Sequence, residues 1–147
     1  MRRSEQIRYL LLAAQREGNR RLAAALSKIE LSPAQSEILR ILGDHNTLTL
    51  TGIGQMLVCD SATSPSRLVE RLVDAGFINR TPDLHDRRQV HLALTPAGQE
   101  KELQVRTIEN ALYDELDALP GADEFVSTLE LLVTGLPAGK ALKLRIG

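Results

Sequence analysis

Two short segments of the sequence hold the side chains best suited to bind a phosphate polymer. They comprise Ser64, Ser66, Arg67 and Arg71 in the first segment, and Arg87 and Arg88, which follow the acidic Asp86, in the second. Arginine donates paired N–H groups to phosphates and to guanine, and serine hydroxyls bind base edges or phosphates. Four-residue spacing lets Arg67 and Arg71 point in one direction from a helix. Ser64-Pro65 predicts the start of that helix, where unpaired backbone N–H groups favour an anion.

The other reactive residues do not form a catalytic or metal-binding pattern. The three histidines, His45, His85 and His91, lack the spacing of a metal site. Acidic residues are concentrated on two amphipathic segments near the C-terminus, as expected for a solvated helix face. The sequence therefore predicts a binding protein, with no enzymatic activity and with no metal or cofactor.

Cys59 is the one cysteine of the chain. It has no partner for an intramolecular disulfide, and no second thiol is available to resolve a sulfenic acid. The expected role is that of a small buried hydrophobic residue. A thiol-based redox switch at Cys59 is the alternative.

The chain has the length of one domain and carries its charge unevenly. It has 147 residues and a formal net charge of −1. Residues 1–28 hold seven basic and two acidic side chains, whereas residues 99–135 hold two basic and nine acidic ones. Such segregation allows a basic face on a protein of near-neutral charge. No apolar signal segment or membrane-length run is present, so we expect a cytoplasmic protein that does not enter a membrane.

Apolar spacing and capping residues predict a mainly helical chain. The expected N-terminal elements are a helix over 7–29, a helix from Ser32-Pro33 to about Leu42, a strand at 48–50, a short helix carrying Ile53, Met56 and Leu57, and a helix from Ser64-Pro65 that Gly76 ends. The expected C-terminal elements are strands at 77–80 and 90–94, a long helix from Thr95-Pro96 to Pro120-Gly121, and a last helix before Pro137. The two strands predict a hairpin with an arginine-bearing tip.

Two short helices joined by a tight turn and followed by a hairpin are typical of a winged helix-turn-helix, whose second helix reads the DNA major groove. Residues 31–103 resemble the core of the MarR family of bacterial regulators. The resemblance is carried by Leu31-Ser32-Pro33-Ala34-Gln35, by the run from Ser64 to Ile78, and by the run from Asp86 to Gly98. The last run, with its Asp-x-Arg pattern and Leu94-Thr95-Pro96-Ala97-Gly98, is its most specific part.

The resemblance implies a homodimeric transcription repressor that binds a pseudopalindromic duplex site. In this interpretation residues 1–30 and 99–136 form a helical dimerisation region, residues 31–98 form the winged DNA-binding domain, and residues 137–147 form a basic C-terminal tail. It also implies that Arg88 enters the minor groove while Asp86 orients it, and that a small-molecule effector binds between the two regions. One alternative is a winged-helix protein-interaction module without DNA binding, because residues 62–98 hold only five basic side chains against four acidic ones.

Overall fold

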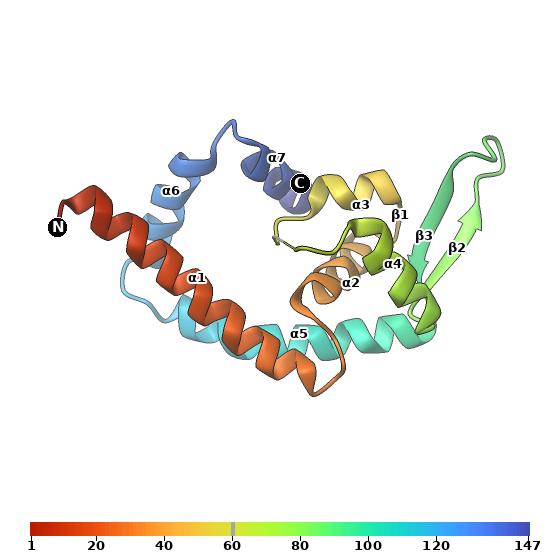
Figure 1. The fold of residues 1–147 in the computed structure, drawn as a ribbon, viewed down its shortest axis with the longest axis horizontal. Helices are drawn as coiled ribbons and strands as arrows, with labels where there is room; N and C mark the ends of the chain where they lie inside the picture. Colours follow the sequence, from red (N-terminus) through yellow and green to blue (C-terminus); the bar gives the residue numbers. More distant parts are fainter. Residues whose placement is uncertain (60) are drawn as a thin grey trace.

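The computed structural model of the chain describes residues 1–59 and 61–147, whose arrangement Figure 1 shows. The element order over this part is α1 (Arg3–Ser27), α2 (Pro33–His45), β1 (Thr47–Thr49), α3 (Leu50–Met56), α4 (Pro65–Asp74), β2 (Ile78–Pro82), β3 (Val90–Leu94), α5 (Pro96–Asp117), α6 (Ala122–Val133) and α7 (Pro137–Ile146). The predicted fold class, mainly helical with a small β wing, is confirmed.

The three helix starts predicted from serine or threonine followed by proline are confirmed. Ser32, Ser64 and Thr95 each accept the backbone N–H three residues further on, at N–O distances of 3.2, 3.4 and 2.9 Å. A proline occupies the start of each helix, where its missing N–H costs no helical hydrogen bond. The capping residues therefore fix where α2, α4 and α5 begin.

Helix α2 extends three residues beyond the predicted end at Leu42. It ends at His45, and Asn46 adopts a positive φ of 61° after it. Gly43, the residue after the predicted end, lies inside the helix. A Cβ at Gly43 would come within 2.7 Å of the Glu102 Oε1 atom on α5. This glycine therefore allows close packing between two helices and does not end one.

The strand predicted at 48–50 is displaced by one residue. Strand β1 ends at Thr49, and Leu50 begins α3. Thr49 ends the strand and also caps the helix, because its Oγ1 accepts the Gly52 N–H at 3.1 Å. The three strands form one antiparallel sheet in the order β1-β3-β2, so β3 is central. The hairpin pairs Ile78 with Leu94 at its base and Pro82 with Val90 at its outer end.

The hydrophobic core lies where α2, α3, α4 and the sheet meet the end of α1 and the beginning of α5. Its fully buried members are Leu26, Ile38, Leu39, Leu42, Ile53, Leu72, Ile78 and Val105. These residues come from α1, α2, α3, α4, β2 and α5. They hold α4 and the wing in a fixed relation to each other.

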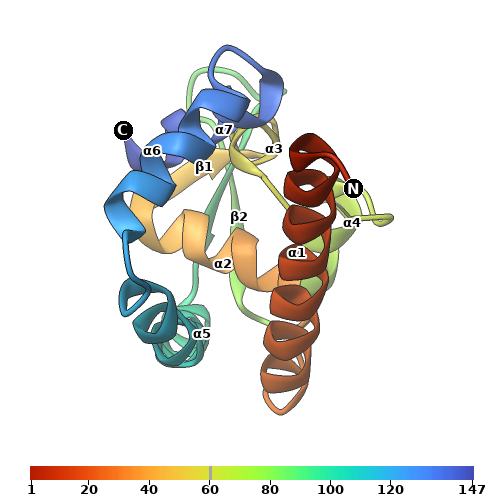
Figure 2. The same cartoon turned by 90° about the vertical axis from the view of Figure 1, so that its left-hand side faces the viewer.

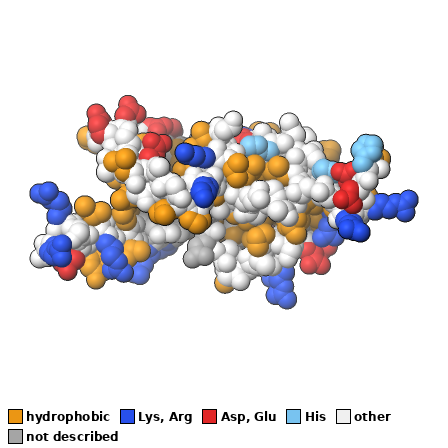
Figure 3. All heavy atoms as spheres, turned by 90° about the horizontal axis from the view of Figure 1, so that it is seen from above, with side chains coloured by type: hydrophobic (Ala, Val, Ile, Leu, Met, Phe, Trp, Pro, Cys, Tyr) orange, Lys and Arg blue, Asp and Glu red, His pale blue; other side chains and the backbone are white. Residues whose placement is uncertain are grey.

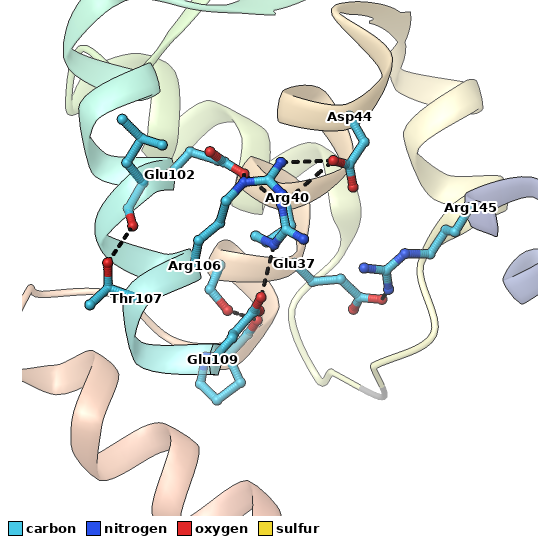
Figure 4. Close-up of polar contacts among 11 residues, drawn as sticks. Glu37, Arg40, Asp44, Glu102, Arg106, Thr107, Glu109 and Arg145 are labelled. Atoms are coloured by element: carbon cyan, nitrogen blue, oxygen red, sulfur yellow. Dashed lines mark hydrogen bonds and ion pairs between the residues drawn. The ribbon is translucent and has the colours of Figure 1, made fainter. Parts of the chain in front are cut away.

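A cluster of charged residues joins α2 to α5 beside this core (Figure 4). Arg40 donates to Glu102 at 2.6 Å and to Glu109 at 2.8 Å. Arg106 pairs with Glu102 at 2.6 Å and with Asp44 at 2.7 Å. Both glutamates are buried, and each has a guanidinium partner as buried charges require. The winged unit, which comprises α2, α3, α4 and the three strands, is thus attached to α5 by ion pairs as well as by apolar contacts.

The predicted basic tail at residues 137–147 forms the helix α7, which packs beside α3. Gly139 and Ala141 are buried, and a Cβ at Gly139 would overlap the Val133 carbonyl oxygen. Arg145 reaches back to α2, where its Nη1 lies 2.6 Å from Glu37 Oε1 (Figure 4). The C-terminal segment therefore contacts the winged unit.

Helix α6 and the N-terminal half of α1 lie at the end of the molecule opposite to the wing (Figure 1), and in Figure 2 this end faces the viewer. No residue of α6 is buried, and apolar side chains including Phe125, Leu131 and Leu132 are exposed on it. Across residues 1–59 and 61–147, no helix combines the length and the apolar character needed to cross a membrane.

Candidate nucleic-acid interface

Helix α4 has one buried face and one exposed face. Leu68, Val69 and Leu72 are buried in the core, whereas Ser66, Arg67 and Arg71 are exposed. At the N-terminus of the helix, Ser64 Oγ lies 3.2 Å from Ser66 Oγ. The structure therefore brings the four predicted residues of this segment together on the surface of a firmly anchored helix.

The two arginines of α4 are not neutralised by nearby acids in the described part of the chain. Glu70 and Asp74 lie on the same helix, but neither Arg67 nor Arg71 forms an ion pair with a described residue. Arg71 faces a cavity between α1 and α4, and Arg67 is not among the residues that line it. Both arginines are thus available to an external partner.

The wing places the other predicted basic residues on an exposed loop. Arg87 and Arg88 lie between β2 and β3, and both are exposed. Figure 1 shows the hairpin projecting beyond the rest of the molecule, at the same end as α4. In the surface view of Figure 3, Lys and Arg side chains gather mainly at the two ends of the molecule.

Asp86 contacts Arg88 through the backbone. Its Oδ1 accepts the Arg88 N–H at 3.0 Å, and no ion pair joins the two side chains in this structure. The predicted role of Asp86 in orienting the Arg88 side chain toward DNA stays a prediction. The carboxylate fixes the main chain at Arg88 and leaves the guanidinium exposed.

The turn between α3 and α4 is held by a residue that the sequence did not reveal as functional. Glu37 of α2 accepts the Val58 N–H at 2.7 Å and the Cys59 N–H at 2.9 Å. Its side chain is only 6% exposed and also binds Arg145. In the sequence, Glu37 appears only as an acidic residue on the apolar face of α2. Its hydrogen-bond partners lie 21, 22 and 108 positions away, so no local pattern reveals its role.

Comparison with known proteins gives a family match over the segment that contains α4 and the arginines of the wing. The model of the MarR family matches residues 31–90, from the start of α2 to the start of β3. The transcriptional regulator PecS of Dickeya dadantii is 33% identical over 119 residues, which cover 78% of this chain and 70% of PecS. The chain belongs to the MarR family.

Two further MarR-family relatives are similar over much of their length. The organic hydroperoxide resistance transcriptional regulator of Bacillus subtilis is 32% identical over 98 residues, or 67% of this chain, and the match spans just under two thirds, 66%, of that relative. The structure of a Cys-to-Ser mutant of MarR from E. coli, complexed with operator DNA, has a TM-score of 0.70 at 26% identity and covers 88% of this chain and 91% of that one. The predicted resemblance to the MarR family and the predicted winged helix-turn-helix fold are confirmed.

The environment of Cys59 in this MarR-family chain differs from the prediction. The residue is exposed, not buried, because it lies in the surface turn held by Glu37. Partial enclosure of the thiol, together with the Glu37 carboxylate, raises the pKa of Cys59 to about 11. At neutral pH such a thiol is protonated, and it is the thiolate that reacts with oxidants.

An open cavity of about 920 Å³ lies between α1 and the winged unit of this MarR-family chain. Its walls come from α1, α2, the α3–α4 turn, α4 and α7. Its basic lining residues are Arg16, Arg20, Arg71 and Arg145. Arg20 is paired with Glu17 and Arg145 with Glu37, so Arg16 and Arg71 are the lining arginines without an ion pair to a described residue.

The described residues contain no group of three or more His, Cys, Asp or Glu side chains arranged to bind a metal ion. His91 instead pairs with Asp83 in the wing, with 2.7 Å between Nε2 and Oδ2.

Proposed function

We propose that this chain is a transcription regulator that binds duplex DNA through α4 and the wing, and that it acts in the cytoplasm as a binding protein without catalysis. The observation that carries the proposal is the placement of Arg67 and Arg88. Both are exposed, both lack an ion-pair partner among the described residues, and both lie at the wing end of the molecule. Helix α4 would lie in the major groove, with Ser64, Ser66 and Arg67 near base edges.

The wing would bind the neighbouring minor groove through Arg88, with Arg87 and Arg71 near the phosphate backbone. A narrow minor groove in A·T-rich DNA has enhanced negative potential and attracts arginine. Support comes from the operator-DNA complex of the similar E. coli protein. It also comes from the lack of an ion pair between any of these guanidinium groups and a described carboxylate.

The regulator would act as a homodimer built from residues 1–30 and 99–136. Helix α6 supports this, because a twelve-residue apolar helix with no buried residue is not stable against water on its own. Exposed apolar residues on the first half of α1 and on the end of α5, including Ile7, Leu10 and Leu116, extend the same surface. A two-fold pair would place the recognition helices about 34 Å apart, one turn of the double helix.

A small anionic effector would bind in the cavity beside α4 and release the DNA. Arg16 and Arg71, which form no ion pair with a described residue, support an anion, and the shared walls of α1 and α4 would couple the occupancy of the cavity to the position of α4. Repression relieved by such a ligand is the mode of regulation that fits this arrangement. A panel of small carboxylates should then include compounds that raise the Tm and weaken DNA binding, and the effector proposal fails if none does either.

Selection of bound sequences from a random duplex pool tests the DNA-binding proposal. We expect a pseudopalindromic consensus whose affinity falls steeply as salt rises, because arginine–phosphate contacts release counterions. The alternative protein-interaction module, suggested by the low net basicity of residues 62–98, would retain no duplex at any salt concentration.

A further inference from the structure

We infer that Asp83 and His91 are positioning residues, which shape the wing loop so that Arg87 and Arg88 face the DNA. The inference rests on the proposed DNA-binding function and adds two residues to it. Neither residue would contact DNA in this account. They would act by holding the backbone of residues 83–89 in the conformation that binding requires.

The Asp83 carboxylate accepts three hydrogen bonds at the outer end of the hairpin. Oδ1 accepts the backbone N–H of His85 at 2.7 Å and that of Asp86 at 3.2 Å. Oδ2 lies 2.7 Å from His91 Nε2. One side chain therefore joins the central strand β3 to the first half of the loop.

A second turn continues this network up to the arginines. The Asp83 N–H donates to the Gln89 carbonyl at 3.0 Å, and the Gln89 N–H donates to the Asp86 carbonyl at 3.0 Å. Asp86 Oδ1 in turn accepts the Arg88 N–H. Hydrogen bonds thus connect His91 to the backbone of Arg88 without a break.

The network begins from a rigid position. His91 pairs with Thr49 on β1 and with Thr81 on β2, so its backbone is held on both sides of the sheet. The next residue, Leu92, is buried in the core. The orientation of a loop attached at this point is therefore set by the sheet. The core in turn fixes the position of the sheet relative to α4.

The network contributes little to the core of the protein. Residues 84–90 are all exposed, and none belongs to the core cluster. Hydrogen bonds from the His85 backbone, the His91 ring and the Asp86 backbone lower the pKa of Asp83 below its ordinary value, so the carboxylate stays ionised near neutral pH. The cluster therefore serves the shape of the loop more than the stability of the fold.

Five variants test the inference on the full-length protein: Asp83→Ala, Asp83→Asn, His91→Phe, Arg88→Ala and Gln89→Ala. Asparagine can still accept the two loop N–H groups, so Asp83→Asn should retain most of the affinity for a duplex selected with the wild type. Asp83→Ala and His91→Phe should weaken binding by about fivefold to tenfold, the factor expected when ordering of a loop is lost on the scale of one hydrogen bond. Gln89→Ala is the matched control, because it keeps the Gln89 backbone groups that belong to the network and removes a side chain that makes no hydrogen bond with the described residues.

Amide hydrogen exchange on the free protein gives a readout that does not depend on DNA. The His85 and Asp86 amides should exchange faster in Asp83→Ala than in the wild type or in Asp83→Asn, while the Tm stays within about 2 °C, as for a substitution outside the core. If the wild type binds no duplex, the proposed function fails. If the wild type binds and Arg88→Ala weakens binding, but Asp83→Ala binds like Gln89→Ala, the inference is overturned while the proposed function stands.

Discussion

An arginine is available to DNA when no carboxylate of the same protein already holds it. This chain contains arginines that are held in this way and arginines that are not. Arg40, Arg106 and Arg145 are each held by acids at 2.6 to 2.8 Å. Arg67 and Arg88 have no such partner among the described residues. The first group stabilises the fold, and the second is available to an external anion.

Replacing Arg88 with alanine should weaken DNA binding without changing the oligomeric state. The loss should be larger for sites with A·T-rich flanks, because their narrow minor groove attracts arginine most strongly. Fluorescence anisotropy with two duplexes that differ only in the flanks measures this. Arg8→Ala removes the same charge from α1, at the other end of the molecule, and should have little effect. Equal losses for both variants would contradict a role of the wing.

Replacing Arg67 with alanine should cost about 1–3 kcal/mol of binding free energy at the selected site, if the side chain contacts a base. The preference at one position of the site should also relax. Binding of the variant to the selected duplex and to random DNA measures both effects. Equal losses on the two duplexes would reassign Arg67 to a phosphate.

Peroxide treatment should leave DNA binding by the wild type unchanged and equal to that of Cys59→Ser. The raised pKa of about 11 keeps the thiol protonated at neutral pH, where its reaction with peroxide is slow. Binding measured before and after treatment checks this. If peroxide abolished DNA binding by the wild type but not by Cys59→Ser, the alternative of a redox switch at Cys59 would be supported.

The elements themselves were predictable where the signals were local. Each Ser-Pro or Thr-Pro start is confirmed, because a cap and a proline act within one turn of a helix. The end of α2 was not predictable, because Gly43 is required by Glu102, which lies far along the sequence. Gly98 is similar, since a Cβ there would overlap the Phe77 carbonyl oxygen.

The candidate site was predictable for the side chains that point outward, but not for those that hold them. Arg67 and Arg88 were visible from spacing and from the Asp-x-Arg pattern. Glu37 and Asp83 act on backbone N–H groups of a turn and a loop, and loop conformation is not encoded in a local periodicity. Cys59 is exposed and has a raised thiol pKa, to which the Glu37 carboxylate contributes. This environment was not predicted, because the contact between Glu37 and the turn is not visible in the sequence.

Replacing Arg145 with methionine should lower the stability of the protein by about 1–3 kcal/mol, because the buried Glu37 carboxylate would lose its cation. Thermal and urea unfolding measure the change. Lys143→Met removes a charge from the same helix at an exposed position and should change stability by less than about 0.5 kcal/mol. Similar effects of the two substitutions would mean that α7 does not act on Glu37.

At the scale of the whole molecule, a single chain leaves the apolar side chains of α6 exposed. Helix α6 buries none of its residues, and it lies at the opposite end from the wing (Figure 1). One ion pair, Arg21 with Glu115 at 2.7 Å, already joins the basic α1 to the acidic α5. A second copy that covers the apolar faces would bring two winged units under one two-fold axis.

Replacing Leu132 with glutamate should dissociate the proposed dimer. The residue is 52% exposed in the single chain, and a carboxylate buried at an apolar interface is strongly disfavoured. Analytical ultracentrifugation over a range of concentrations measures the shift toward monomer, with Glu130→Gln on the same helix as the control. A variant that remains as dimeric as the wild type would place the interface elsewhere.

The most direct test of the account is the mass of the complex between the wild type and a selected duplex, measured by light scattering at low and at raised salt. We predict two protein chains per duplex at low salt, and dissociation from DNA into free protein dimers as salt rises. A monomeric protein that binds no duplex even at low salt would contradict the account.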